Sequence, residues 1–323
     1  MPLKSRLLIR IALTAFSGGL YAAFPDKPIT IVIPFAAGGP TDALARALSI
    51  SLAATLKQPV TIESVPGGGG TLGTSRVVKA KPDGHTLLFH NIGLSATPAL
   101  HRSLPFNVTA DVEPIALVAD VPLALIARTN FPGNDFREFV AYARANKGKV
   151  TMGNAGPGSA THLCGMMIMS AIETDLTTVP FKGTGPAIKE LHSGQLDVMC
   201  DQTITSAPQI KAGKVKALGI TSRTRAAALK DLPTLDEQGA KGFKVAAWTA
   251  LFTSKDTPKD VIDTLARAVQ TAIQDPQVRA RLQDAGAEPV AVKRATPEAL
   301  RAHLKAEIDR WTPLIKKAGV YAD

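Results

Sequence analysis

Four glycine-rich segments of the sequence carry residue types that can bind an anion. They are AAGGPT (36–41), GGGG (67–70), GPGSAT (156–161) and FKGTG (181–185), and each precedes a stretch predicted to be helical. The first turn of a helix presents unpaired N–H groups and a partial positive charge, and glycine allows the backbone to approach a ligand closely. These segments predict a site in which backbone amides and small hydroxyls hold a carboxylate without a buried arginine.

Ser159 and His162 are the one pair that could form a catalytic nucleophile. Residues three apart are neighbours on a helix surface, but the sequence contains no Gly-x-Ser-x-Gly elbow and no evident acid to orient the histidine. The sequence therefore predicts no catalytic residue and no enzyme. An exported esterase is the least favoured alternative, and it would require Ser159 for turnover.

Metal, nucleotide and nucleic-acid chemistry find little support in the sequence. The six histidines are not spaced as ligand pairs, and Cys-x-x-Cys is absent. The run Gly67–Gly70 lacks the Lys-Ser/Thr of a phosphate-binding loop. The basic cluster Lys211, Lys214 and Lys216 contains no aromatic residue that could stack on a base. We expect no metal, no cofactor and no nucleic acid.

The elements that must position the glycine-rich segments alternate between strand and helix. Ile29–Phe35 is an almost continuous apolar run, typical of a strand buried on both faces of a parallel sheet. A helix follows, with Thr41 as its predicted N-cap and leucines every fourth residue from Leu44 to Leu56. Val60–Val65 and Thr86–His90 are predicted to be the next two strands.

The middle of the chain repeats this arrangement without repeating the sequence. The predicted strands and helices are Val150–Gly153, Thr161–Ile172, Thr177–Pro180, a helix opened by Pro186, Leu196–Cys200 and Val215–Thr221. The C-terminal third is predicted to be helical, with Leu300, Leu304 and Trp311 on one apolar stripe. In such α/β sheets, ligands bind beyond the carboxyl ends of the strands.

Two segments are predicted to cross between two lobes, near Leu123–Arg128 and near Val245–Phe252. The fold class is therefore α/β with two lobes, each a mostly parallel sheet flanked by helices, and two hinge crossings. Residues 23–123 and 246–323 would form lobe one, and residues 124–245 would form lobe two.

Residues 1–22 have the pattern of a secretory signal peptide. Lys4, Arg6 and Arg10 precede the apolar run Ile11–Leu20, which is too short to span a bilayer, and cleavage after Ala22 would leave a formal charge of +7 from +10. Export places Cys164 and Cys200 in an oxidising compartment, where two cysteines favour a disulfide. Two buried free thiols are the alternative.

Many short motifs occur in an order that resembles one known family. They are FPDKPI (24–29), VIPFAAGG (32–39) with Asp42, Ala45 and Arg46, PGGG (66–69), KPDG (81–84), Gly158-Ser159 with His162-Leu163, VPFKG (179–183), and Gly194-Gln195 before Asp197. Together they resemble the receptors of tripartite tricarboxylate transporters, the family named after the Bordetella uptake genes. The resemblance covers essentially the whole mature chain.

The resemblance implies a periplasmic-binding-protein fold that closes on a small organic carboxylate. It also implies a large and a small membrane subunit as partners of a monomeric receptor. The ligand-binding residues it implies are Phe35, Ala36, Gly38, Gly39, Thr41, Gly158, Ser159, Thr161, Phe181, Gly183 and Asp201. Phe181 departs from the family pattern, in which tyrosine is common.

The function predicted from these residues is a periplasmic solute-binding protein that captures a carboxylate for transport. A receptor that reports to a sensor kinase is the main alternative, since its fold and pocket would be the same. The identity of the carboxylate is not encoded in any motif of the sequence.

Overall fold

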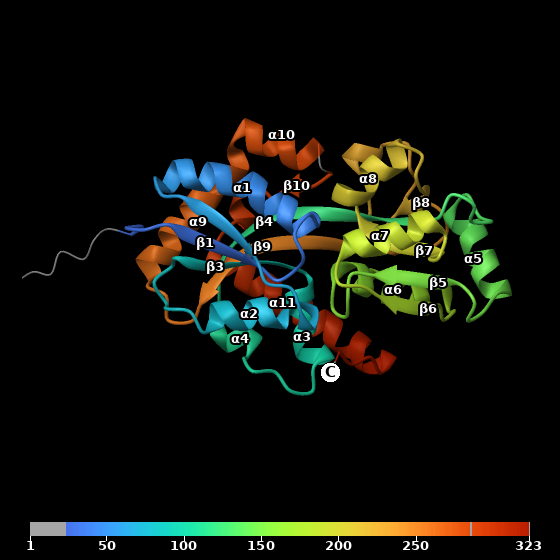
Figure 1. Ribbon diagram of the computed structural model, residues 1–323, viewed down its shortest axis with the longest axis horizontal. Coiled ribbons are helices and arrows are strands. Elements are labelled where there is room, and N and C mark those ends of the chain that lie inside the picture. The colour runs from blue at the N-terminus through green and yellow to red at the C-terminus, as the bar shows by residue number, and fades with distance from the viewer. Residues whose placement is uncertain (1–23, 285, 323) are drawn as a thin grey trace, which may run out of the picture.

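The computed structural model describes residues 24–284 and 286–322, and its strands form two groups that meet at one long strand, β4 (Val112–Ala127). The predicted leader, residues 1–22, lies outside the described residues. Figure 1 shows the two groups side by side along the long axis, with β4 and β9 (Ala246–Ser254) running between them. The molecule therefore has two lobes joined by two crossing strands.

Lobe one contains the first and last parts of the described chain. Its parallel strands β1 (Ile29–Ile33), β2 (Val60–Ser64) and β3 (Thr86–Asn91) are ordered β2-β1-β3, and β9 joins β3 in antiparallel pairing. Its helices and short elements are α1 (Pro40–Leu56), η1 (Gly68–Gly70), α2 (Thr71–Val78), α3 (Gly93–Leu100), α4 (Val108–Asp111), α9 (Lys259–Gln274), α10 (Pro276–Asp284), β10 (Glu288–Pro289), η3 (Val292–Arg294) and α11 (Pro297–Ala318).

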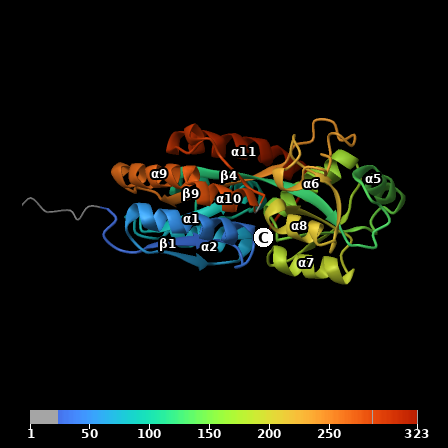
Figure 2. The same ribbon diagram turned by 90° about the horizontal axis from the view of Figure 1, so that it is seen from above.

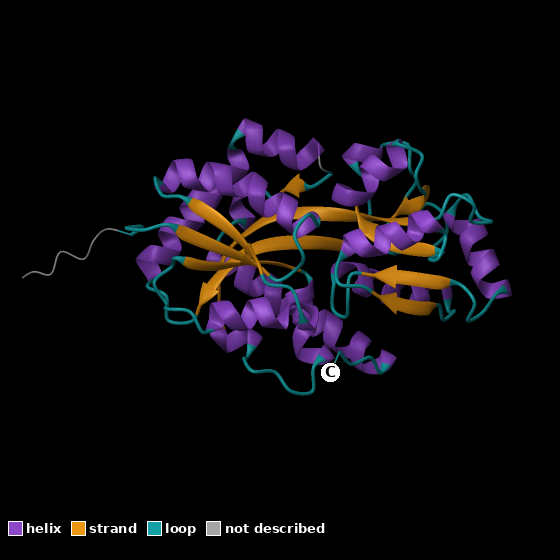
Figure 3. Cartoon of the chain, viewed as in Figure 1, coloured by secondary structure: helices purple, strands orange, loops and turns teal. Residues whose placement is uncertain are grey.

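Lobe two repeats the parallel arrangement on a smaller scale. Its strands β5 (Thr151–Asn154), β6 (Thr177–Pro180) and β7 (Val198–Gln202) are parallel, while β8 (Lys216–Ile220) pairs antiparallel with β4. Its helices are α5 (Phe136–Ala145), α6 (Ala160–Ile172), α7 (Thr184–Ser193), α8 (Thr203–Lys211) and the short η2 (Ala227–Leu229). Figure 2 and Figure 3 show helices lying against the strands of both lobes.

The hinge lies where β4 changes partners. Residues 112–122 of β4 pair with β9, and Leu123–Ala127 pair with β7. The Thr221 hydroxyl joins both crossings, because it lies 2.7 Å from the Val245 carbonyl oxygen and 3.1 Å from that of Leu123. The sheets are more mixed than predicted, since a chain that leaves lobe one on β4 and returns on β9 must place these strands antiparallel. The boundaries at 123/124 and 245/246 stay a prediction.

Burial explains why the apolar runs form strands and helices. Ile29, Ile31, Val32 and Ile33 are fully buried, as expected for a strand covered on both faces. The helix α1 begins at Pro40 with Gly39 as its N-cap, so the prediction of Thr41 as N-cap was wrong. Proline suits the first helical turn because its missing N–H would be unpaired there anyway.

Two other sequence predictions can be compared with the structure. Helix α7 begins at Thr184, two residues before the predicted Pro186, with Gly183 as its N-cap. The predicted disulfide is confirmed, since Cys164 of α6 and Cys200 of β7 are joined with their Cα atoms 6.1 Å apart.

No described helix combines the length and apolarity that crossing a membrane requires.

Candidate ligand-binding site

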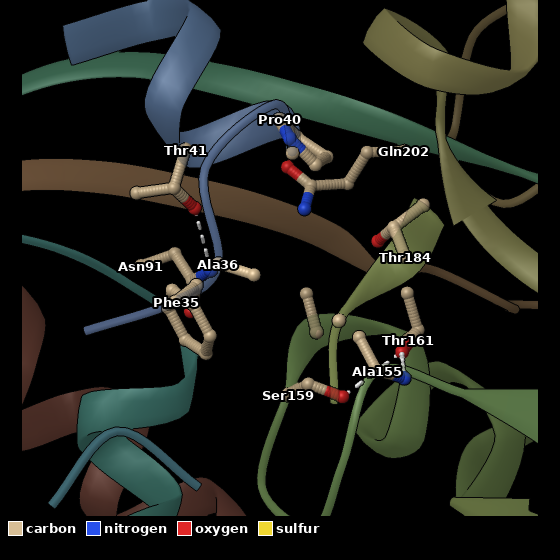
Figure 4. A pocket seen from close by; sticks show the side chains of 13 residues that line it. Phe35, Ala36, Pro40, Thr41, Asn91, Ala155, Ser159, Thr161, Thr184 and Gln202 are labelled. Atoms are coloured by element: carbon tan, nitrogen blue, oxygen red, sulfur yellow. Dashed lines mark hydrogen bonds between the residues drawn. The ribbon is translucent and has the colours of Figure 1, made fainter. Parts of the chain in front are cut away.

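A pocket lies between the lobes, where loops from both lobes face one another (Figure 4). The space between its lining atoms, including the open mouth, is about 350 Å³. Its lining residues are Phe35, Ala36, Gly39, Pro40, Thr41, Asn91, Ala155, Ser159, Ala160, Thr161, Gly183, Thr184 and Gln202.

Four helices begin at this pocket, one from lobe one and three from lobe two. Helix α1 begins with Pro40 and Thr41. The other three follow N-caps that line the pocket: Ser159 for α6, Gly183 for α7 and Gln202 for α8. None of the thirteen lining residues has a charged side chain. The partial positive charges of the helix N-termini therefore act on a neutral pocket, which favours an anion.

Asp42, in the first turn of α1, bonds to the loop that precedes the helix. The Gly38 N–H donates to Asp42 Oδ2 at 2.9 Å, and Arg46 Nε donates to the same oxygen at 3.0 Å. Oδ2 of Asp42 is thus paired with the loop and with the helix, while its buried Oδ1 has no hydrogen-bond partner among the described residues. This pairing fixes the loop that carries Phe35 and Ala36 into the pocket.

The start of α6 is organised by two linked hydroxyl groups. Ser159 Oγ accepts a hydrogen bond from His162 N, Thr161 Oγ1 accepts one from Ala155 N at 2.7 Å, and the two hydroxyl oxygens lie 2.9 Å apart. A pair of hydroxyls has two protons, and the bond between them uses one. Whichever residue donates, one hydroxyl proton is left over to donate to a ligand in the pocket.

His162 is oriented by the backbone and not toward the hydroxyl of Ser159. Its Nδ1 accepts the N–H of Gly158 at 3.1 Å, and burial lowers its pKa to about 4. The ring is therefore neutral at physiological pH. Because Ser159 Oγ bonds to the backbone N–H of His162 and not to its imidazole, the pair lacks the nucleophile–base contact of a hydrolase.

Seven of the eleven residues predicted for the site line this pocket, and four do not. Those that line it are Phe35, Ala36, Gly39, Thr41, Ser159, Thr161 and Gly183. Of the other four, Gly38 and Gly158 are engaged in the backbone contacts described above, and Phe181 packs against the apolar core of lobe two. Asp201 is fully buried on β7 and does not line the pocket.

Asn91 and Gln202 line the pocket but were not predicted. Each is the last residue of a strand, β3 and β7 respectively, and each is 3 % exposed. The Asn91 amide donates to Thr41 Oγ1 at 3.3 Å and accepts from Gly93 N at 2.9 Å. Both residues could have been predicted from their position, because each follows closely after a predicted strand and ligands bind at the carboxyl ends of strands in α/β folds.

Comparisons with known proteins agree with this geometry. The family model described as the tripartite tricarboxylate transporter family receptor matches residues 44–320. The chain belongs to this family. The receptor also resembles the periplasmic binding protein BugD, at 44% identity and a TM-score of 0.88, covering 92% of this chain and 99% of the other.

Two further similar structures contain ligands. MatC from Rhodopseudomonas palustris with bound malate is 40% identical, with a TM-score of 0.86 and coverage of 90% of the receptor and 100% of MatC. Rpa4515 from R. palustris with adipate is 29% identical, with a TM-score of 0.87 and coverage of 92% and 99%. The predicted family and the two-lobed periplasmic-binding-protein fold are confirmed.

Proposed function

We propose that the receptor captures a small organic carboxylate in the periplasm by closing its lobes, and delivers it to the large and small membrane subunits of a tripartite tricarboxylate transporter. The observation that carries the proposal is the meeting of four helix N-termini at one uncharged interlobe pocket. Malate in MatC and adipate in Rpa4515 support a carboxylate as the ligand class. The receptor acts as a monomer and binds its ligand without turnover.

Export and the lobe boundaries belong to the same proposal. Cleavage after Ala22 releases a mature chain that begins at Ala23, and lobe one joins lobe two at 123/124 and 245/246. Mass spectrometry of the protein from a periplasmic extract would give the N-terminus directly. An intact Met1 in that extract would contradict the proposed maturation.

The decisive experiment is a binding screen of the purified mature protein against malate, adipate, citrate, aspartate and benzoate. A ligand that binds only the folded state raises the free energy of unfolding by about 2.7 kcal/mol at a concentration of 100 Kd. Hits from thermal shift are confirmed by calorimetry, with matched controls in which each carboxylate is replaced by a carboxamide. If no carboxylate binds, or if these amides bind equally well, the proposed function is wrong.

A further inference from the structure

Gly69, within the glycine segment 67–70, lies against lobe two, and no residue of the segment lines the pocket. Gly68–Gly70 form η1, and Pro157 in the loop Gly156–Gly158 of lobe two lies opposite Gly69. A β-carbon on Gly69 would collide with the carbonyl oxygen of Pro157. Because Gly69 belongs to lobe one and Pro157 to lobe two, this contact joins the lobes outside the pocket.

A second contact of the same kind involves Gly93, the first residue of α3. A β-carbon there would lie 2.6 Å from the carbonyl oxygen of Gly158, a separation that real β-carbons essentially never show. At the other end of α3, Leu100 Cδ1 lies 2.8 Å from the position that a β-carbon on Gly158 would take. Helix α3 and η1 therefore form a surface, here named the latch seat, against which the loop Gly156–Gly158 packs.

The loop cannot easily move aside within lobe two. Asn154 Oδ1 accepts the N–H of Gly156, Gly156 O accepts that of Ser159, and His162 Nδ1 accepts that of Gly158, at 2.9–3.1 Å. A side chain added to the latch seat would thus push against fixed backbone. The shift it requires is a separation of the two lobes.

We propose that Gly69 and Gly93 are positioning residues whose missing β-carbons allow the lobes to close fully. Ser159 directly follows the loop, so seating Gly158 against Gly93 also sets how near Ser159 comes to Asn91 across the pocket. The inference rests on the proposed closure of the lobes. It assigns Gly69 of the glycine segment 67–70 to lobe contact in place of ligand binding.

The test measures closure without any ligand. Cysteines are introduced as Ala36→Cys and Gly183→Cys, whose β-carbons would lie 3.4 Å apart, close to the roughly 3.5–4.5 Å of a disulfide. The rate at which this cross-link forms reports how often the lobes close. In this background we expect Gly93→Ala to slow the cross-link by about tenfold or more, because overpacking at a fixed contact penalises the closed state.

Each latch variant has a matched control. Gly185→Ala also adds a β-carbon in the first turn of a helix, but at a position where no described atom beyond its chain neighbours and its own helix backbone lies within 4 Å. Gly69→Ala, at φ +63, is matched by Gly148→Ala, at φ +73 with open space around it, so that backbone strain alone is accounted for. Gly69→Ala should slow the cross-link as Gly93→Ala does, and both controls should match the parent.

The outcomes separate this inference from the proposed function. Parent-like rates in Gly69→Ala and Gly93→Ala, with thermal melts that show folded protein, would overturn the latch. Equal slowing in latch variants and controls would overturn it as well. Failure of every carboxylate in the binding screen would contradict the proposed function and leave the cross-link result intact. A β-carbon on Gly93 would also lie 3.1 Å from Asn91 Oδ1, so Gly93→Ala could slow the cross-link by displacing Asn91. Gly69→Ala has no such contact with Asn91 and therefore tests the lobe contact alone.

Discussion

The hydroxyl of Thr205 donates a hydrogen bond to the carboxyl of Asp201 across 2.5 Å, at the junction of β7 and α8. Asp201 is fully buried, and its second oxygen, Oδ1, has no hydrogen-bond partner among the described residues. Burial raises the pKa of Asp201 to about 7, although the bonds from Thr205 and the Gln202 backbone favour the charged form. The carboxyl of Asp201 therefore lies in the interior of lobe two, and only the next residue, Gln202, lines the pocket.

The first prediction concerns the pH dependence of stability through Asp201. Between its ordinary pKa of 3.8 and the folded value of about 7, the folded state binds more protons than the unfolded state. The wild-type free energy of unfolding should thus fall, relative to that of Asp201→Asn, as pH rises through this window. The slope should be at most about 1.4 kcal/mol per pH unit. Urea denaturation at pH 4, 5.5 and 7.5 measures it.

A surface aspartate provides the control for this measurement. Asp231 is exposed, so Asp231→Asn should follow the wild-type stability at all three pH values. If the difference between wild type and Asp201→Asn were constant with pH, the carboxyl of Asp201 would not change its protonation on unfolding, and the account of its burial would be wrong.

The second prediction is that Ser159 contributes more to ligand affinity than Lys182. Ser159 is 3 % exposed and lines the pocket, whereas Lys182 is exposed and does not. Ser159→Ala should weaken carboxylate binding by roughly 1–3 kcal/mol through a lost charge-assisted hydrogen bond. Lys182→Ala should have a smaller effect. Calorimetry with the tightest carboxylate of the screen compares the two.

Ser159→Ala also removes the N-cap of α6, which lowers stability by about 1 kcal/mol. Asp135→Ala removes the side-chain cap of α5 in the same lobe, away from the pocket, and should lower stability while affinity is retained. A larger loss of affinity for Lys182→Ala, together with strong weakening by salt, would indicate an ion-pair site and reject the recognition described here.

The third prediction is that the disulfide between Cys164 and Cys200 stabilises lobe two. The two residues are 36 apart in sequence, and a loop of that length corresponds to about 3–4 kcal/mol in the chain-entropy treatment. Reducing the protein should lower its urea midpoint accordingly. The double variant Cys164→Ala/Cys200→Ala should be less stable than the oxidised wild type and insensitive to reductant. Titration of two thiols in denatured, unreduced periplasmic protein would contradict the bond.

Strand β1 was predictable because its burial is reflected in the nearly continuous apolar run Ile29–Phe35. Strand β6 coincides with the predicted Thr177–Pro180, although its residues TTVP are mostly exposed. Helix α8 was not predicted, since it begins directly after β7 and its sequence TITSAPQIK is polar and contains Pro208. Its burial comes from contacts with β4, which are remote in sequence.

The site was predictable where helix N-termini mark it, and less so elsewhere. Ser159 has a side chain typical of a helix N-cap, whereas the N-cap of α1 was predicted at Thr41 and lies at Gly39; all three residues line the pocket. Asn91 and Gln202 resemble any polar residue at the end of a strand. The segment 67–70 has the composition of an anion site, yet it faces Pro157 of lobe two. Which loops face each other across a cleft depends on lobe orientation, which local sequence does not encode.

The last prediction concerns the hinge, where Thr221 joins the two crossings. Thr221 is fully buried, and its hydroxyl can donate only one proton, for which the Val245 carbonyl at 2.7 Å is the nearer acceptor. Thr221→Val keeps the shape but leaves that carbonyl without the hydroxyl, so we expect a loss of about 1–3 kcal/mol in the free energy of unfolding. Thr221→Ser keeps the hydroxyl and removes one methyl group, which corresponds to about 0.8 kcal/mol of apolar burial. Urea denaturation should therefore rank serine above valine. The reverse order would mean that the methyl group, and not the hydrogen bond, holds the crossings together.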